Sequence, residues 1–209
     1  MRRTGRTKTG SAEEAALWKR AAKAENSGLF ALSLELTRMY VHAYPDNVWG
    51  WAVLGLRFGG LTRLVEARGA LAIALRMAPR SVRGRLYWIV ASFYDEISDL
   101  ERAMFWLRRL VAICPDTPSW ILKGCVHARL GEHAEAKRCH KNAIEANDGD
   151  VDEAYYNLGL LLRAEGDYTR ARRCLEKALE LDPHYGVAER ALRDVAAAVE
   201  LRLERGPTD

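Results

Sequence analysis

Apolar residues in the stretch 152–185 recur in two runs, at intervals of three and four positions, with polar residues between them. The first run is Tyr155, Leu158 and Leu162, and the second is Ala171, Leu175 and Ala178. Residues at these intervals lie on one face of an α-helix, so each run predicts an amphipathic helix. Gly166 stands between the runs and can adopt a left-handed backbone conformation, which predicts a tight turn. We therefore expect a helix–turn–helix unit.

The same pattern returns along the chain with a period of about 34 residues. Pro45 and Pro79 are 34 residues apart, Pro79 and Pro115 are 36 apart, and Pro115 and Pro183 are 68 apart, which is twice 34. The stretch 48–81 repeats the offsets of 152–185 to its proline, at Trp51, Leu54, Gly55, Phe58, Ala67, Leu71 and Ala74. A fixed period of this length indicates stacked helix pairs, because one pair cannot bury its apolar face alone.

These residues resemble the tetratricopeptide repeat (TPR) family, whose pattern is a large aromatic residue, Leu-Gly, an aromatic, Ala, a large apolar residue, Ala and Pro. The resemblance covers five copies, at about 14–47, 48–81, 84–116, 117–151 and 152–185. The first copy is degenerate, and the fourth has Asp148 in place of the proline. The resemblance implies an all-α fold, a right-handed TPR superhelix (α-solenoid) of five helix–turn–helix repeats.

The two ends of the chain differ from the repeats. Residues 186–205 predict one further helix, with an apolar stripe at Val187, Leu192, Val195 and Val199. A helix with a polar back would cap the open end of a solenoid, and residues 206–209 would form a short tail. Residues 1–12 contain four basic residues and no acid, which predicts a disordered tail. This tail could contact nucleic acid or an anionic surface, or it could simply be solvated.

Arginine is concentrated in one part of the repeats. Between residues 48 and 93 every basic residue is Arg, and the one acid is Glu66. The arginines are Arg57, Arg63, Arg68, Arg76, Arg80, Arg83 and Arg85. Guanidinium groups bind carboxylates and phosphates through two parallel hydrogen bonds, so these residues could form a docking patch for an acidic partner. Alternatively, they form a solvated face that pairs with acids of the next copy.

The TPR resemblance also implies a binding surface, because the first helix of each pair lines the concave groove in that family. The residues that map to groove positions and could contact a partner are Trp18, Trp49, Leu56, Trp88, Ile121, Tyr156, Asn157 and Leu160. Tryptophan and tyrosine are typical anchors of binding sites. We therefore expect an apolar or amphipathic segment of another protein, held as a helix or an extended peptide. Alternatively, the tail or a sister chain covers Trp18 and Trp49.

Several other functions lack a matching motif. The family's carboxylate clamp for chaperone tails needs Lys and Asn at groove positions where this chain has Ala52 and Leu56. The chain has no Gly-rich phosphate loop, HExxH motif or nucleophile elbow, so we expect neither catalysis nor a cofactor. The four cysteines show no zinc-ligand spacing. His127 and His140 could hold a metal within copy four, but packing residues are the favoured interpretation, and we expect no metal site.

Together these features predict a non-catalytic protein–protein interaction module, as a scaffold, an adaptor or a chaperone-like subunit. The alternative is a regulatory or accessory subunit of an enzyme or a nucleic-acid-processing complex, docked through the arginines and the basic tail. Nucleic acid would be a partner only through these two features, and a homo-oligomer stays open. No apolar run approaches the roughly 18 residues of a membrane span, and we expect a cytoplasmic protein.

Overall fold

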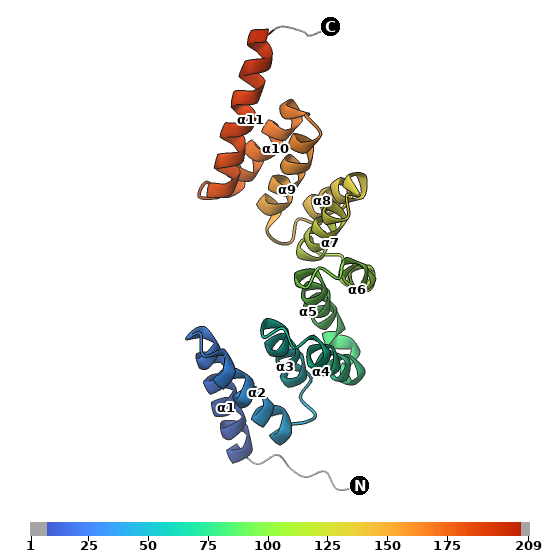
Figure 1. Cartoon of the computed structure of the whole chain (residues 1–209). Coiled ribbons are helices and arrows are strands. Elements are labelled where there is room, and N and C mark those ends of the chain that lie inside the picture. The colour runs from blue at the N-terminus through green and yellow to red at the C-terminus, as the bar shows by residue number, and fades with distance from the viewer. Residues whose placement is uncertain (1–7, 206–209) are drawn as a thin grey trace. The chain divides into compact units, whose positions relative to one another are not determined.

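The computed structural model describes residues 8–205, and all regular secondary structure in this range is helical (Figure 1). The helices are α1 (Lys8–Asn26), α2 (Phe30–Ala43), α3 (Val48–Gly60), α4 (Leu64–Met77), the 3₁₀ helix η1 (Arg80–Val82), α5 (Arg83–Glu96), α6 (Leu100–Ile113), α7 (Thr117–Arg129), α8 (His133–Ala146), α9 (Val151–Ala164), α10 (Tyr168–Leu181) and α11 (Gly186–Arg205). The predicted all-α fold is confirmed. No helix in the described part of the chain is long and apolar enough to cross a membrane.

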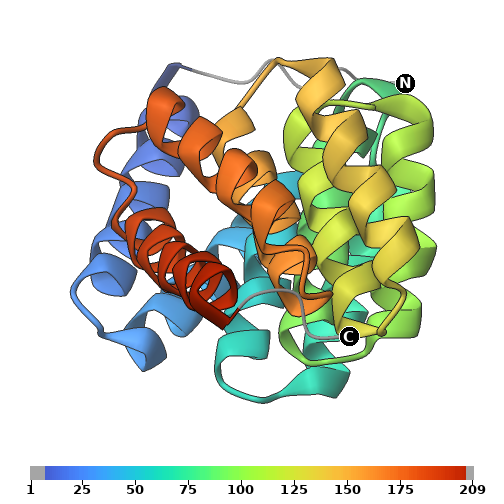
Figure 2. The same cartoon turned by 90° about the horizontal axis from the view of Figure 1, so that it is seen from above.

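Each predicted copy contains one pair of consecutive helices, and η1 accommodates the longer spacing before the third copy. Consecutive helices pack together within the pairs α1–α2, α3–α4, α7–α8 and α9–α10. The chain divides into two compact units, residues 1–93 and residues 94–209. The first unit contains α1 to α4 and most of α5, and the second contains α6 to α11. Within the second unit, α10 and α11 lie side by side (Figures 1 and 2).

Side-chain caps fix where several helices begin. Asn47 accepts a hydrogen bond from the backbone N–H of Gly50 at 3.0 Å and so caps α3. Asp99, Asp116 and Asp167 cap α6, α7 and α10 in the same way. Such a cap satisfies one of the backbone donors that the first helical turn leaves without a partner.

The turns inside the pairs use a left-handed residue, as predicted for Gly166. Gly28, Gly131 and Gly166 have φ values of +72°, +77° and +77°. The second and third copies place Thr62 and Ser98 at the equivalent position, with φ values of 59° and 60°. Glycine adopts this conformation without steric cost, whereas a β-branched residue such as Thr does not.

The two helices of a pair approach closely at one glycine. A Cβ added to Gly159 would lie 3.0 Å from Cγ of Leu175, and one added to Gly55 would lie 2.6 Å from Cγ of Leu71. In the fourth copy, a Cβ on Gly124 would lie 2.6 Å from Cε1 of His140. The glycine therefore makes room for the large residue of the second helix.

Asp148 replaces the proline that ends the other copies, and its hydrogen bonds hold the chain where it leaves α8. Its carboxylate accepts a hydrogen bond from the backbone N–H of Thr117 at 2.7 Å. The Thr117 hydroxyl donates to the carbonyl of Ala143 at 2.9 Å. These bonds link the end of α8 to the start of α7, so the fourth copy does not need a proline at this point.

The ends of the described chain differ in detail from the prediction. Residues 1–7 of the expected basic tail and residues 206–209 lie outside the described residues, and α1 already begins at Lys8. In α11 the buried residues are Ala188, Ala191 and Val195, and the latter two join the core of α9 and α10. We expected Val187 on the apolar stripe, but it is 37% exposed, because the buried face of α11 begins at Ala188.

Candidate functional site

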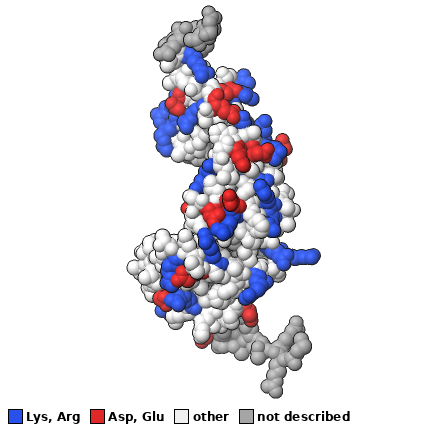
Figure 3. Space-filling view, turned by 45° about the vertical axis from the view of Figure 1, so that its right-hand side comes forward, with Lys and Arg blue, Asp and Glu red and all other residues white. Residues whose placement is uncertain are grey.

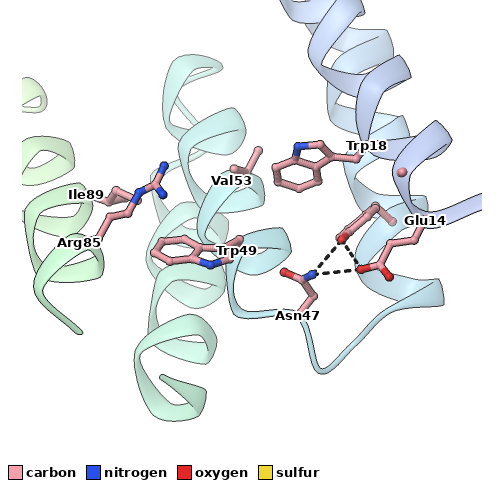
Figure 4. Close-up of a pocket in the computed structure, with 9 residues that line it drawn as sticks. Glu14, Trp18, Asn47, Trp49, Val53, Arg85 and Ile89 are labelled. Carbon is pink, nitrogen blue, oxygen red and sulfur yellow. Dashed lines mark hydrogen bonds between the residues drawn. The ribbon is translucent and has the colours of Figure 1, made fainter. Parts of the chain in front are cut away.

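A pocket of about 480 Å³ opens among α1, α3 and α5, within the first unit (Figure 4). We call it the tryptophan pocket. The residues that line it are Glu14, Ala15, Trp18, Tyr40, Asn47, Trp49, Val53, Arg85 and Ile89. The first helices of three successive copies thus supply all but two of the lining residues.

Each of the three helices contributes two residues spaced four apart. These pairs are Glu14 and Trp18 on α1, Trp49 and Val53 on α3, and Arg85 and Ile89 on α5. Residues at i and i+4 lie one above the other on the same helix face. The repeat therefore presents the same face of each helix to one shared pocket.

Aromatic rings form much of the wall. The rings of Trp18 and Tyr40 pack in a tilted arrangement with their centroids 5.0 Å apart. The guanidinium carbon of Arg85 lies 4.9 Å from the centre of the Trp49 ring. Trp18 and Trp49 are both half-buried, so part of each ring remains open to an occupant. A cation above an indole face is attracted by the negative face of the ring.

A hydrogen-bonded group closes the end of the pocket away from Arg85 (Figure 4). Tyr40 donates its hydroxyl to Oε1 of Glu14 at 2.8 Å. The side-chain amide of Asn47 donates to the same oxygen at 3.3 Å and to the Tyr40 hydroxyl at 2.9 Å. Because Asn47 also caps α3, its position is fixed from two sides. This end of the pocket is therefore polar and held in place.

The structure brings only part of the predicted groove together. Trp18 and Trp49 line the tryptophan pocket, whereas Leu56 lines a separate pocket of about 200 Å³ with Glu25 and Phe30. Trp88 is 43% exposed but does not line the tryptophan pocket.

Ile121 requires a correction. It is only 5% exposed and packs with Ala143 and Ala154 in the core. Its side chain therefore holds helices of adjacent copies together and is not available to a partner.

The other predicted groove residues lie on α9 in the second unit. The rings of Tyr156 and Tyr185 have centroids 5.1 Å apart. The amide of Asn157 lies 3.7 Å from the sulfur of Cys125, and Leu160 packs partly against the core around Leu175. All three are half-buried. Their part in binding stays a prediction.

Sequence reasoning did not select Val53, Ile89 or the Glu14–Tyr40–Asn47 group. Val53 and Ile89 each follow a predicted residue, Trp49 or Arg85, by four positions, and this spacing is the signal that could have found them. No comparable signal marks Glu14 and Tyr40, which are 26 residues apart in the sequence.

The arginines do not form one uniform patch. Arg57 forms an ion pair with Glu25 of the preceding copy, and Arg63 forms one with Glu66 at 2.6 Å. Arg83 donates to the carbonyl of Ala78 at 3.3 Å. Arg85 lies in the tryptophan pocket, Arg68 is half-buried, and Arg76 and Arg80 are exposed. On the face that Figure 3 shows, basic and acidic side chains are interspersed.

Among the described residues, no group of three or more His, Cys, Asp or Glu side chains is arranged to hold a metal ion. His127 lies with Nδ1 2.5 Å from a carboxylate oxygen of Glu132. His140 is buried, and burial lowers its pKa to about 4.

The cysteines are free thiols, and two of them have strongly raised pKa values. The Cys114 thiol donates to Asp116 at 2.8 Å, and this bond with burial raises the pKa of Cys114 to about 11. Burial raises the pKa of Cys125 to about 11. The thiolate is the reactive form of cysteine, so neither residue is set up as a nucleophile.

Two family models described as the tetratricopeptide repeat match residues 117–150 and 152–185. Among solved structures, the chain is similar to TTC0263, a thermophilic TPR protein of Thermus thermophilus, with a TM-score of 0.64 and 19% identity over 88% of this chain and 99% of that one. It is also similar to YrrB, described as a TPR protein with an unusual peptide-binding site, with a TM-score of 0.61 and 20% identity over 83% of this chain and 88% of that one.

A curated human relative, the protein O-mannosyl-transferase TMTC3, is 23% identical over 190 residues. The match covers 83% of this chain but only 21% of TMTC3, so the chain spans about a fifth of that relative's length. The family models identify residues 117–150 and 152–185 as tetratricopeptide repeats, and the helix pairs and the structural likenesses show that the described chain has the fold of tetratricopeptide repeat proteins.

Proposed function

We propose that this protein is a non-catalytic interaction module that holds an apolar or amphipathic segment of a partner protein in the tryptophan pocket. The observation that carries the proposal is the pocket itself, in which the first helices of three successive copies present two half-buried tryptophans together with Val53 and Ile89. YrrB, which shares the fold, is described as having a peptide-binding site. Proteins of this repeat class generally act through binding surfaces and not through catalysis.

Physical arguments favour a protein segment as the occupant. Tryptophan carries a large share of the binding energy in protein interfaces, because it buries much surface at a small cost in conformational entropy. The hydrogen bonds among Glu14, Tyr40 and Asn47 hold one end of the pocket in place before binding. A preformed site loses less entropy when it binds. A volume of about 480 Å³ suits one or two large apolar side chains and not a whole helix.

The test is affinity purification of the tagged protein from its native cells, with washes at low and high salt and identification of bound proteins by mass spectrometry. We expect a partner that survives high salt and is lost when Trp49→Ala is introduced, because burial of apolar surface is insensitive to salt screening. Trp88→Ala is the matched control, since Trp88 is an exposed tryptophan that does not line the pocket. Circular dichroism must show unchanged helix content in both variants.

Two outcomes would contradict the proposal. If Trp18→Ala and Trp49→Ala retain every partner, the tryptophan pocket is not the binding site. If the partners instead dissociate at high salt and are lost in an Arg76→Glu, Arg80→Glu double variant, the protein is an accessory subunit docked through its exposed arginines. The second candidate is favoured only by the exposure of these two side chains.

A further inference from the structure

We infer that the segment bound in the tryptophan pocket carries an Asp or Glu side chain beside its apolar anchor, and that Arg85 binds this carboxylate. The inference deepens the proposed function and rests on it. It commits to an acidic, amphipathic protein segment as the occupant.

Arg85 lies at one end of the pocket with its guanidinium over the Trp49 ring (Figure 4). The side chain as a whole is exposed, and it forms no ion pair with the side chains of residues 12–202. The attraction to the ring depends on the positive charge of the guanidinium and does not use up its N–H donors. From its place over Trp49, Arg85 can therefore donate two parallel hydrogen bonds to a carboxylate.

The opposite end of the pocket has a different electrostatic character. Glu14 is negatively charged, but its Oε1 already accepts hydrogen bonds from Tyr40 and Asn47. A carboxylate on the occupant would be repelled by Glu14 and attracted by Arg85. The apolar anchor would lie between them, against Trp18, Val53 and Ile89. The pocket thus sets the direction as well as the composition of the bound segment.

The surrounding charge favours the same occupant. The stretch 48–93 contains seven arginines and a single acid, Glu66, and that acid is already paired with Arg63. This excess of positive charge raises the rate at which an acidic segment associates. Nucleic acid fits less well, because its phosphates need several cations along a track. The tryptophan pocket has one arginine and also a carboxylate, which would repel a phosphate.

The experiment is selection of random peptides displayed on phage, with the C-terminus of each peptide fused to the coat protein. This fusion removes free C-terminal carboxylates, so any selected acid must be a side chain. Full-length wild-type protein, Arg85→Glu and Arg76→Glu are used as parallel baits. Arg76 provides the matched control, because it is exposed and does not line the pocket. Enriched peptides are then synthesised, and their dissociation constants are measured by calorimetry.

We expect wild-type protein and Arg76→Glu to select a large apolar residue with Asp or Glu within about four positions of it. Arg85→Glu should lose this preference and select Lys or Arg at the same place. For a selected peptide, Arg85→Glu should weaken binding by about tenfold or more, and replacing the peptide's acid by its amide should cost nothing further in that variant.

Other results would overturn the inference in distinguishable ways. If the selected peptides depend on Trp49 but show no preference for acids, or bind Arg85→Glu equally well, the inference falls and the proposed function stands. If no peptide depends on Trp18 or Trp49, both fall. Binding of a labelled single-stranded DNA that is lost with Trp49→Ala would assign the pocket to nucleic acid. A dimer that dissociates with Trp49→Ala would assign it to a second copy of the chain.

Discussion

His140 shows how one residue can alter a repeat without changing its fold. It occupies the position that Leu71, Leu107 and Leu175 fill in other copies, and it is 1% exposed. Its Nδ1 is buried without a hydrogen-bond partner. A buried polar atom in this state costs free energy that a leucine would not.

We expect the stability of the protein to fall on acidification because of His140. Burial lowers its pKa in the folded state to about 4, below the ordinary value of 6.5. The contribution of neutral His140 to the free energy of unfolding is therefore complete above about pH 6.5. It is lost as the pH falls towards 4, because the unfolded chain takes up the proton first. The free energy of unfolding falls by about 3 kcal/mol by pH 4 from this residue. Urea unfolding at pH 7.5 and pH 4.5 measures it.

His140→Leu provides the control for this pH dependence. The variant should lose less free energy of unfolding between pH 7.5 and pH 4.5, because leucine does not titrate. It should also be more stable at pH 7.5, because Leu175 fills the equivalent position beside Gly159 in the last copy. Carboxylates that also titrate near pH 4 remain in both proteins and cancel in the comparison. An equal loss in wild type and variant would show that His140 is not the titrating group.

The left-handed turn residues allow a second prediction at this scale. Thr62→Gly should stabilise the protein by about 1 kcal/mol, because a β-branched residue is strained at its φ of 59°. The reverse change, Gly131→Thr, tests the same turn position where a new Cβ would meet no atom within 4 Å. It should destabilise by a similar amount. Equal melting temperatures for all three proteins would contradict the strain.

At the scale of helices, the sequence was sufficient to predict the pairs and their turns, because both follow from local rules. Apolar spacing predicts the helices, and Gly166 predicts the left-handed turn of the last copy, whereas nothing in the sequence marks Thr62 and Ser98 as left-handed. Local rules do not say which side of a helix packs on the next copy. The groove positions that the family resemblance implies include Ile121, which is buried, and they place Leu56 with Trp49, although the two residues line different pockets.

The contact between paired helices gives the prediction at this scale. Gly159→Leu should destabilise the protein by about 3 kcal/mol, because a new Cβ would already lie 3.0 Å from Leu175 before the rest of the side chain is added. Gly69→Leu on α4 is the control, since nothing lies within 4 Å of a Cβ there, and it should stabilise slightly through higher helix propensity. Denaturant midpoints of the two variants should move in opposite directions. A wild-type midpoint for Gly159→Leu would contradict the close approach.

At the scale of the whole molecule, the main question is whether binding uses the first unit alone or also α9. The family resemblance predicted a groove that includes Tyr156, Asn157 and Leu160, whereas the tryptophan pocket lies entirely within residues 14–89. The sequence could not separate these possibilities, because every copy has a large apolar or aromatic residue at one of the groove positions. Only side-chain packing shows where a pocket forms.

Hydrogen exchange of the complex with a selected peptide separates the two possibilities. A bound ligand slows local opening of the elements that it contacts, so exchange should slow in α1, α3 and α5 and stay unchanged in α9 to α11. Trp49→Ala should abolish the protection, and Trp88→Ala should preserve it, because only Trp49 lines the pocket. Protection that extends over residues 151–164 would show that α9 takes part. It would contradict a binding site confined to the first unit.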